Sequence, residues 1–224
     1  MTKPRASVPA KWQPLLEDID AQIGEPVELH CLGGFGLDAM GALDRPTEDI
    51  DFLPVLPSRL LRKLEELAGR GTTLARRHGR YIEAVTVAEY SEDYRTRLIP
   101  IASNLQKIEL LALEPHDLAL AKLTRNGPKD RYDVAHLAKR GLIEPTTLYE
   151  RYQQSVRPYL RLTDRHDLTI ELWVQDIREM KVQELTVERK DIEKQSTIGR
   201  QRTELDPKKR KKHKQRGPGH SNGM

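Results

Sequence analysis

The chain has 224 residues, of which 37% are apolar and 5% aromatic, enough for one domain with a modest core plus additions. A single cysteine, Cys31, excludes an intramolecular disulfide and a zinc cluster built on cysteines. The net charge of +4 is uneven, because residues 181–224 carry +7 and residues 1–180 carry −3. Apolar runs stay well short of the ~18 residues of a membrane span, and a signal-peptide pattern is absent. We therefore expect a cytoplasmic protein without a membrane partner.

The apolar spacing predicts strands and helices in a mixed order. Strands are expected at Val27–Leu32, Asp49–Leu53, Tyr81–Val87, Arg97–Ile101 and Lys107–Leu113. Helices are expected at residues 12–23 and 58–68, from Pro115, from Pro128 to the residue before Gly141, from Pro145 and from Thr163. This order places the chain in the α+β class.

Composition divides the chain into a flexible leader at 1–10, a main domain at 11–145, C-terminal helices at 146–186 and a disordered basic tail at 187–224. Residues 207–216 hold seven Lys or Arg, a density that cannot build a core. Such a segment binds nucleic acid by releasing counterions from phosphates. We expect the tail to contact nucleic acid, with a solubilising extension as the alternative.

Two carboxylates stand two positions apart in the second predicted strand. Side chains alternate between the faces of a strand, so Asp49 and Asp51 project together while Ile50 and Phe52 point to the other side. Adjacent like charges repel unless a cation lies between them. Because Mg²⁺ (or Mn²⁺) prefers oxygen ligands and is commonly held by carboxylates plus substrate phosphates, we interpret the pair as metal ligands. Two solvated acids at a strand edge are the alternative.

A glycine pair, Gly33 and Gly34, ends the first predicted strand. Backbone without a Cβ approaches a phosphate closely and offers its N–H groups. Together with the two aspartates, the pair predicts metal-assisted transfer of a nucleotidyl group from an NTP; a plain tight turn is the alternative. The glycine spacing fails the dinucleotide-binding fingerprint, and the sequence has no P-loop motif.

Four segments resemble the nucleotidyltransferase superfamily related to DNA polymerase beta. They are Gly33-Gly34-Phe35-Gly36-Leu37 with Arg45-x-Thr47-x-Asp49-Ile50-Asp51, Arg80–Val85, Pro115–Leu123 and Lys129–Val134. Within that superfamily the chain is similar to the bacterial group of the AbiEii-type toxins of type IV toxin–antitoxin systems, and it is more similar still to a set of uncharacterised nucleotidyltransferase-like proteins near that group. The resemblance covers roughly residues 24–152 and implies a nucleotidyltransferase fold, with a small mixed sheet flanked by helices and a helical C-terminal part.

The resemblance also implies further site residues: Glu83 as a third metal-binding carboxylate, Lys122 as a triphosphate contact and catalytic residue, Asp130 and Asp133 as catalytic acids, and Arg45 and Thr47 as nucleotide contacts. Each has a plainer alternative. Glu83 could be an outward-facing strand acid, and Lys122 could cover apolar surface with its stem. Asp130 and Asp133 could be acids favoured in the first turn of a helix, and Arg45 and Thr47 could make contacts within their loop. Two features depart from the superfamily pattern, since Phe35 replaces the usual Ser or Thr and Glu83 stands where Asp is more common.

The sequence therefore predicts a metal-dependent nucleotidyltransferase with an NTP as donor. The resemblance favours RNA or tRNA as the acceptor and implies a toxin with a cognate antitoxin as partner. The alternative is a catalytically silent module of the same fold that binds nucleic acid or a protein partner. The two departures favour the silent module, whereas the intact Asp49 and Asp51 pair favours the enzyme. An antitoxin or other regulator has the least support.

Overall fold

The computed structural model describes residues 5–86, 88, 90–161 and 163–204. Within these described residues, the chain up to Met180 forms one compact unit and the chain from Lys181 forms a second. The helices within the described ranges include none that is both long enough and apolar enough to cross a membrane.

Within the described residues, six strands form one mixed sheet in the order β1-β5-β6-β2-β3-β4. The strands are β1 (Ala6–Ser7), β2 (Val27–Cys31), β3 (Asp49–Phe52), β4 (Tyr81–Ala84), β5 (Ile99–Ala102) and β6 (Ile108–Ala112). The pairs β1–β5, β6–β2 and β3–β4 are parallel, whereas β5–β6 and β2–β3 are antiparallel. The parallel pairing of β3 with β4 places Asp51 beside Glu83.

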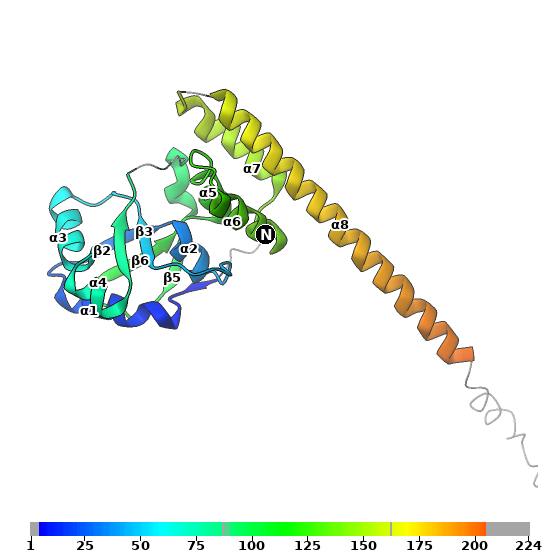
Figure 1. Ribbon diagram of the computed structural model, residues 1–224, viewed down its shortest axis with the longest axis horizontal. Helices are drawn as coiled ribbons and strands as arrows, with labels where there is room; N and C mark the ends of the chain where they lie inside the picture. Colours follow the sequence, from blue (N-terminus) through cyan, green and yellow to red (C-terminus); the bar gives the residue numbers. More distant parts are fainter. Residues whose placement is uncertain (1–4, 87, 89, 162, 205–224) are drawn as a thin grey trace, which may run out of the picture. The chain divides into compact units, whose positions relative to one another are not determined.

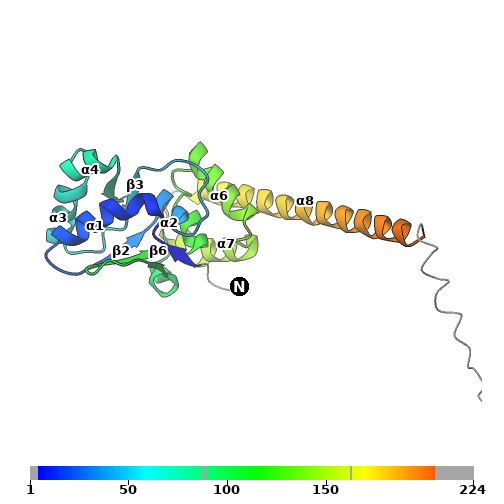
Figure 2. The same cartoon turned by 90° about the horizontal axis from the view of Figure 1, so that it is seen from below.

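Eight α-helices lie within the described residues. They are α1 (Gln13–Gln22), α2 (Gly33–Ala39), α3 (Ser58–Ala68), α4 (Thr73–His78), α5 (Pro115–Leu120), α6 (Pro128–Lys139), α7 (Pro145–Arg151) and α8 (Thr163–Glu204). Helices α1, α3 and α4 contact one another, and α5 contacts α2, α6 and α7. Both views place these two groups on opposite sides of the strands (Figure 1, Figure 2). Proline begins α5, α6 and α7, where its fixed φ suits the first helical turn.

The apolar side of β3 faces the core. Ile50 and Phe52 are fully buried, as are Trp12 and Phe35, whose rings meet edge to face with centroids 5.3 Å apart. The Trp12 indole Nε1 donates a hydrogen bond of 2.8 Å to Asp38, so its polar atom is satisfied. The other side of β3 therefore carries its two aspartates away from this core.

The predicted α+β arrangement, a mixed sheet flanked by helices, is confirmed. The structure adds α4, where no helix was predicted, and β1, which lies inside the predicted flexible leader and pairs with β5. Helix α8 extends to Glu204, whereas disorder was predicted from residue 187. The basic run at 207–216 and the last residue of the predicted strand Tyr81–Val87 lie outside the described residues.

An ion-pair cluster joins the start of α5 to α7 and to the 3-10 helix η2 (Glu92–Arg97). The buried Asp117 carboxylate accepts two hydrogen bonds from Arg97, of 2.9 and 3.0 Å, and lies 3.2 Å from Arg151. Glu114 binds Arg151 and lies 2.7 Å from His116 Nδ1. Burial raises the pKa of Glu114, but His116 and Arg151 more than offset it and lower the pKa to about 2. The Glu114 carboxylate is therefore charged and stabilising at neutral pH.

We expect Glu114→Gln to lower the free energy of unfolding at pH 7. A fall in pKa from 4.5 to about 2 corresponds to about 3 kcal/mol. Because the folded-state pKa is depressed, this contribution is full above pH 4.5 and is lost as the pH falls towards 2. The measurement is urea unfolding of both proteins at several pH values between 7 and 3, where the difference should narrow. Glu150→Gln, an exposed change on α7, should stay within about 0.5 kcal/mol of wild type throughout.

Candidate metal and nucleotide site

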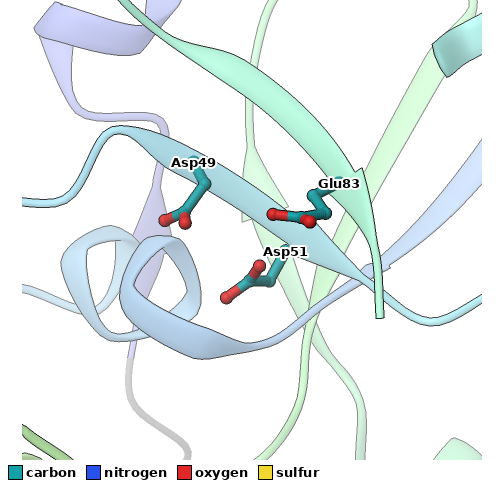
Figure 3. A group of neighbouring side chains, drawn as sticks. All are labelled: Asp49, Asp51 and Glu83. Carbon is teal, nitrogen blue, oxygen red and sulfur yellow. The ribbon is translucent and has the colours of Figure 1, made fainter. Parts of the chain in front are cut away.

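Three carboxylates meet on the side of β3 and β4 opposite the core. Along β3, Asp49 and Asp51 are half-buried while Ile50 and Phe52 are buried, which confirms the predicted alternation. Carboxylate oxygens of Asp49, Asp51 and Glu83 all lie within 4.8 Å of one another. Figure 3 shows the three side chains turning towards one another from the two strands. We call this group the carboxylate triad.

Asp51 carries the strongest electrostatic strain in the triad. Burial, then the charges of Asp49 and Glu83, raise its pKa from 3.8 to about 7, although Lys122 and Arg125 act in the opposite direction. Within the described part of the chain, neither the Asp51 carboxylate nor the Glu83 carboxylate accepts a hydrogen bond or forms an ion pair. Buried carboxylates normally have such partners. A divalent cation suits this arrangement, because it prefers oxygen ligands and neutralises adjacent like charges.

Asp49 differs, because two hydroxyl groups hold it. Thr47 Oγ1 donates to Asp49 Oδ1 at 2.8 Å, and Tyr81 Oη donates to Asp49 Oδ2 at 3.5 Å. Burial, followed by the charges of the triad, raises the pKa of Tyr81, so its hydroxyl stays protonated and is a donor. Arg70 in turn donates to Tyr81 Oη. Thr47, predicted to contact nucleotide, thus lies against a predicted metal ligand.

The glycine pair lies directly beside the triad. Gly33 has a φ of +62°, which favours glycine, and a Cβ there would overlap the Asp51 carboxylate. A Cβ on Gly34 would overlap Thr47. Both glycines belong to the first turn of α2, whereas the sequence predicted a turn alone. The Asp51 side chain therefore requires the lack of a Cβ at Gly33, and the Thr47 side chain requires it at Gly34.

Asp133 binds two of the predicted cations. Its carboxylate accepts hydrogen bonds from Arg45 Nε at 2.8 Å, from Arg45 Nη2 at 2.7 Å and from Lys122 Nζ at 2.8 Å. Burial acts to raise the pKa of Asp133, but Arg45 and Lys122 outweigh it and lower the pKa. Lys122 is only 4% exposed. The structure thus groups Asp133 with Arg45 and Lys122, and its three-carboxylate cluster contains neither Asp133 nor Asp130.

Asp130 holds a cation that the sequence analysis missed, Arg125. Its carboxylate accepts hydrogen bonds from Arg125 Nε at 2.8 Å and Nη2 at 2.6 Å, and from the N–H of Gly127 at 3.0 Å. Lys122 Nζ lies 3.6 Å away. The Arg125 side chain remains 74% exposed, and its charge reaches Asp51. The available signal was the position of Arg125 one helical turn beyond Lys122.

The sequence analysis did not predict Tyr81 as a site residue. The signal was available, because Tyr81 shares a strand face with Glu83 by the same alternation that relates Asp49 to Asp51. Arg70 had no signal of its own, because it reaches Tyr81 from the turn between α3 and α4.

A family model described as a nucleotidyltransferase of unknown function (DUF6036) matches residues 13–196. The chain belongs to this family. Comparisons with curated proteins and with solved structures found no match. The mixed sheet with its flanking helices is consistent with a nucleotidyltransferase fold.

We expect Asp51→Asn to raise the melting temperature in metal-free buffer at pH 8, by roughly 2–6 °C. The reason is that the change removes a buried charge that two neighbouring carboxylates repel. Added Mn²⁺ should then raise the melting temperature of the wild type but barely that of the variant. Differential scanning fluorimetry with and without Mn²⁺ measures both effects. Asp176→Asn, an exposed change on α8, should alter neither value; an equal Mn²⁺ response in Asp51→Asn would contradict the metal assignment.

Proposed function

We propose that this member of the family transfers a nucleotidyl group from an NTP to an acceptor hydroxyl, with Mg²⁺ or Mn²⁺ held by Asp49, Asp51 and Glu83. The observation that carries the proposal is the triad itself. Its oxygens lie within 4.8 Å of one another, and the half-buried Asp51 carboxylate has no hydrogen-bond or ion-pair partner among the described residues. Three carboxylates this close repel one another when no ligand is bound. Such strain is typical of a site that a bound ligand completes.

In the proposed reaction the acceptor oxygen forms a bond to the α-phosphorus, the bond from that phosphorus to the bridging oxygen breaks, and pyrophosphate leaves. The hydroxyl proton passes to solvent. A bound divalent ion lowers the pKa of the attacking hydroxyl and neutralises charge on the phosphates. Positioning and charge stabilisation supply most of the catalysis in such transfers.

Different side chains around the triad would supply the positioning and the charge stabilisation. Thr47 and Tyr81 fix the orientation of Asp49 through its two oxygens. Arg125 offers an exposed guanidinium whose Nε and Nη2 are held by Asp130, which leaves Nη1 for substrate phosphates. Asp130 and Asp133 act in this proposal by positioning cations, and Lys122 adds a buried positive charge near Asp51. The N–H groups of Gly33 and Gly34 remain proposed phosphate contacts.

RNA or tRNA is the acceptor we propose, with a toxin role and a cognate antitoxin as the biological setting. The support for these finer points is the resemblance of the motifs to the AbiEii-type group. The family description supports the transferase class alone.

We expect Asp51→Asn to reduce transfer of labelled nucleotide at least ~100-fold, since it removes charge from the metal site. The assay incubates full-length protein with each labelled NTP, Mg²⁺ and total RNA. Asp176→Asn serves as the matched control and should retain wild-type transfer. Equal transfer by wild type and Asp51→Asn would overturn the proposal, and absence of transfer by the wild type would favour the silent binding module.

We expect Arg125→Gln to raise KM for the NTP by about tenfold or more, the usual cost of a hydrogen bond to a charged group. Arg131→Gln removes a neighbouring exposed arginine that donates to a backbone carbonyl, so it should leave KM near the wild-type value. Initial-rate kinetics over a range of NTP concentrations gives both constants. An unchanged KM in Arg125→Gln would exclude Arg125 as a phosphate contact.

A further inference from the structure

The turn between α3 and α4 places the Arg70 side chain beside the Asp49 end of the triad. The Arg70 guanidinium lies over the Tyr81 ring, 4.5 Å from its centroid, and donates to Tyr81 Oη. Tyr81 Oη is itself 3.5 Å from Asp49 Oδ2. Arg76, on α4, donates to the carbonyl of Gly71 in the same turn. A direct chain of contacts thus links this turn to a proposed metal ligand.

Arg70 and Arg76 keep their full positive charge. Both side chains are exposed, and in the described part of the chain neither forms an ion pair with a carboxylate. Their hydrogen-bond partners are Tyr81 Oη, the Gly71 carbonyl and Thr73 Oγ1, all of them neutral. The cations at the Asp51 end differ, because Asp133 holds Lys122 and Asp130 holds Arg125. An incoming polyanion therefore meets uncompensated positive charge at the Asp49 end.

The geometry of Arg70 favours a nucleotide over a plain anion. The guanidinium lies over the Tyr81 ring and its side chain is exposed, so a ligand can reach it from solvent. Unpaired bases stack on arginine planes and aromatic rings, and arginine binds phosphate through its fork of N–H groups. A base stacked on Arg70, with one phosphate on Arg70 and a neighbouring phosphate on Arg76, would lie next to the triad.

We propose that Arg70, Arg76 and Tyr81 form the docking surface for the end of a single-stranded polynucleotide, the acceptor of the transfer. We name these three residues the acceptor platform. This inference rests on the proposed function for the word acceptor, whereas binding at the platform requires neither metal nor NTP. The occupant is RNA, the acceptor of the proposed function; single-stranded DNA shares the chemistry that the platform recognises and is the competing outcome of the test.

The test is fluorescence anisotropy of full-length protein with a labelled RNA 12-mer and a DNA 12-mer of the same sequence, in EDTA and without NTP. We expect Arg70→Gln to weaken binding of at least one strand about tenfold, because it removes a stacking plane and a phosphate contact. The double change Arg70→Gln with Arg76→Gln should reduce the log–log salt slope by ~1.4, at ~0.7 for each phosphate contact. Arg140→Gln, an exposed change of equal charge at the end of α6, should leave affinity and slope unaltered.

Arg70→Lys separates charge from stacking. The lysine keeps the phosphate contact, so the salt slope should stay at the wild-type value while affinity falls several-fold. Circular dichroism and melting temperature check that each variant is folded. Tighter binding of the RNA strand assigns the platform to RNA, and tighter binding of the DNA strand assigns it to DNA.

Wild-type affinity and slope in the double variant would overturn the platform, and would place any binding in the basic run at 207–216 or elsewhere. The result is independent of catalysis. If Asp51→Asn abolishes transfer while the platform variants bind normally, the platform fails and the transferase proposal stands. If the platform variants lose binding while the wild type transfers no nucleotide, the platform stands and the transferase proposal fails.

Discussion

The rest of the site depends on the mutual repulsion of three carboxylates that the β3–β4 pairing holds together. The register that sets Asp51 beside Glu83 is also the register that sets Ile50 beside Ile82 in the core, so the two strands cannot slide apart without exposing apolar side chains. Burial of the opposite face thus stabilises an arrangement that electrostatics alone would disperse. Burial, together with repulsion by Asp49 and Glu83, raises the pKa of Asp51.

The cations around the triad are arranged in two different ways. At the Asp51 end, Asp130 and Asp133 hold Arg125 and Lys122 in fixed geometry, so positive charge is present but largely balanced. At the Asp49 end, Arg70 bonds to the neutral Tyr81 and forms no ion pair with any described residue. Balanced cations suit fine positioning of one small ligand, whereas uncompensated charge suits attraction of a long polyanion.

The sequence was sufficient wherever the relevant spacing is local. Alternation along one strand predicted the shared face of Asp49 and Asp51, and the order of apolar segments predicted five of the six strands within the described residues. It was insufficient where partners lie far apart, as with Arg45 and Asp133, which are 88 positions apart. Helix α4 escaped prediction because its six residues, half of them Arg or His, are too few for a periodic pattern. The two residues of β1 are fewer still.

The glycine pair shows how one sequence feature can have two physical causes. In the sequence, Gly33 and Gly34 indicate a phosphate contact, since backbone without a Cβ approaches an anion closely. In the structure a steric constraint within the protein also requires glycine at position 33, because a Cβ there would overlap the Asp51 carboxylate. Glycine is thus needed at this position whether or not a phosphate binds. The unpartnered Asp51 is therefore the more independent argument for a ligand, because no internal contact of the described chain accounts for it.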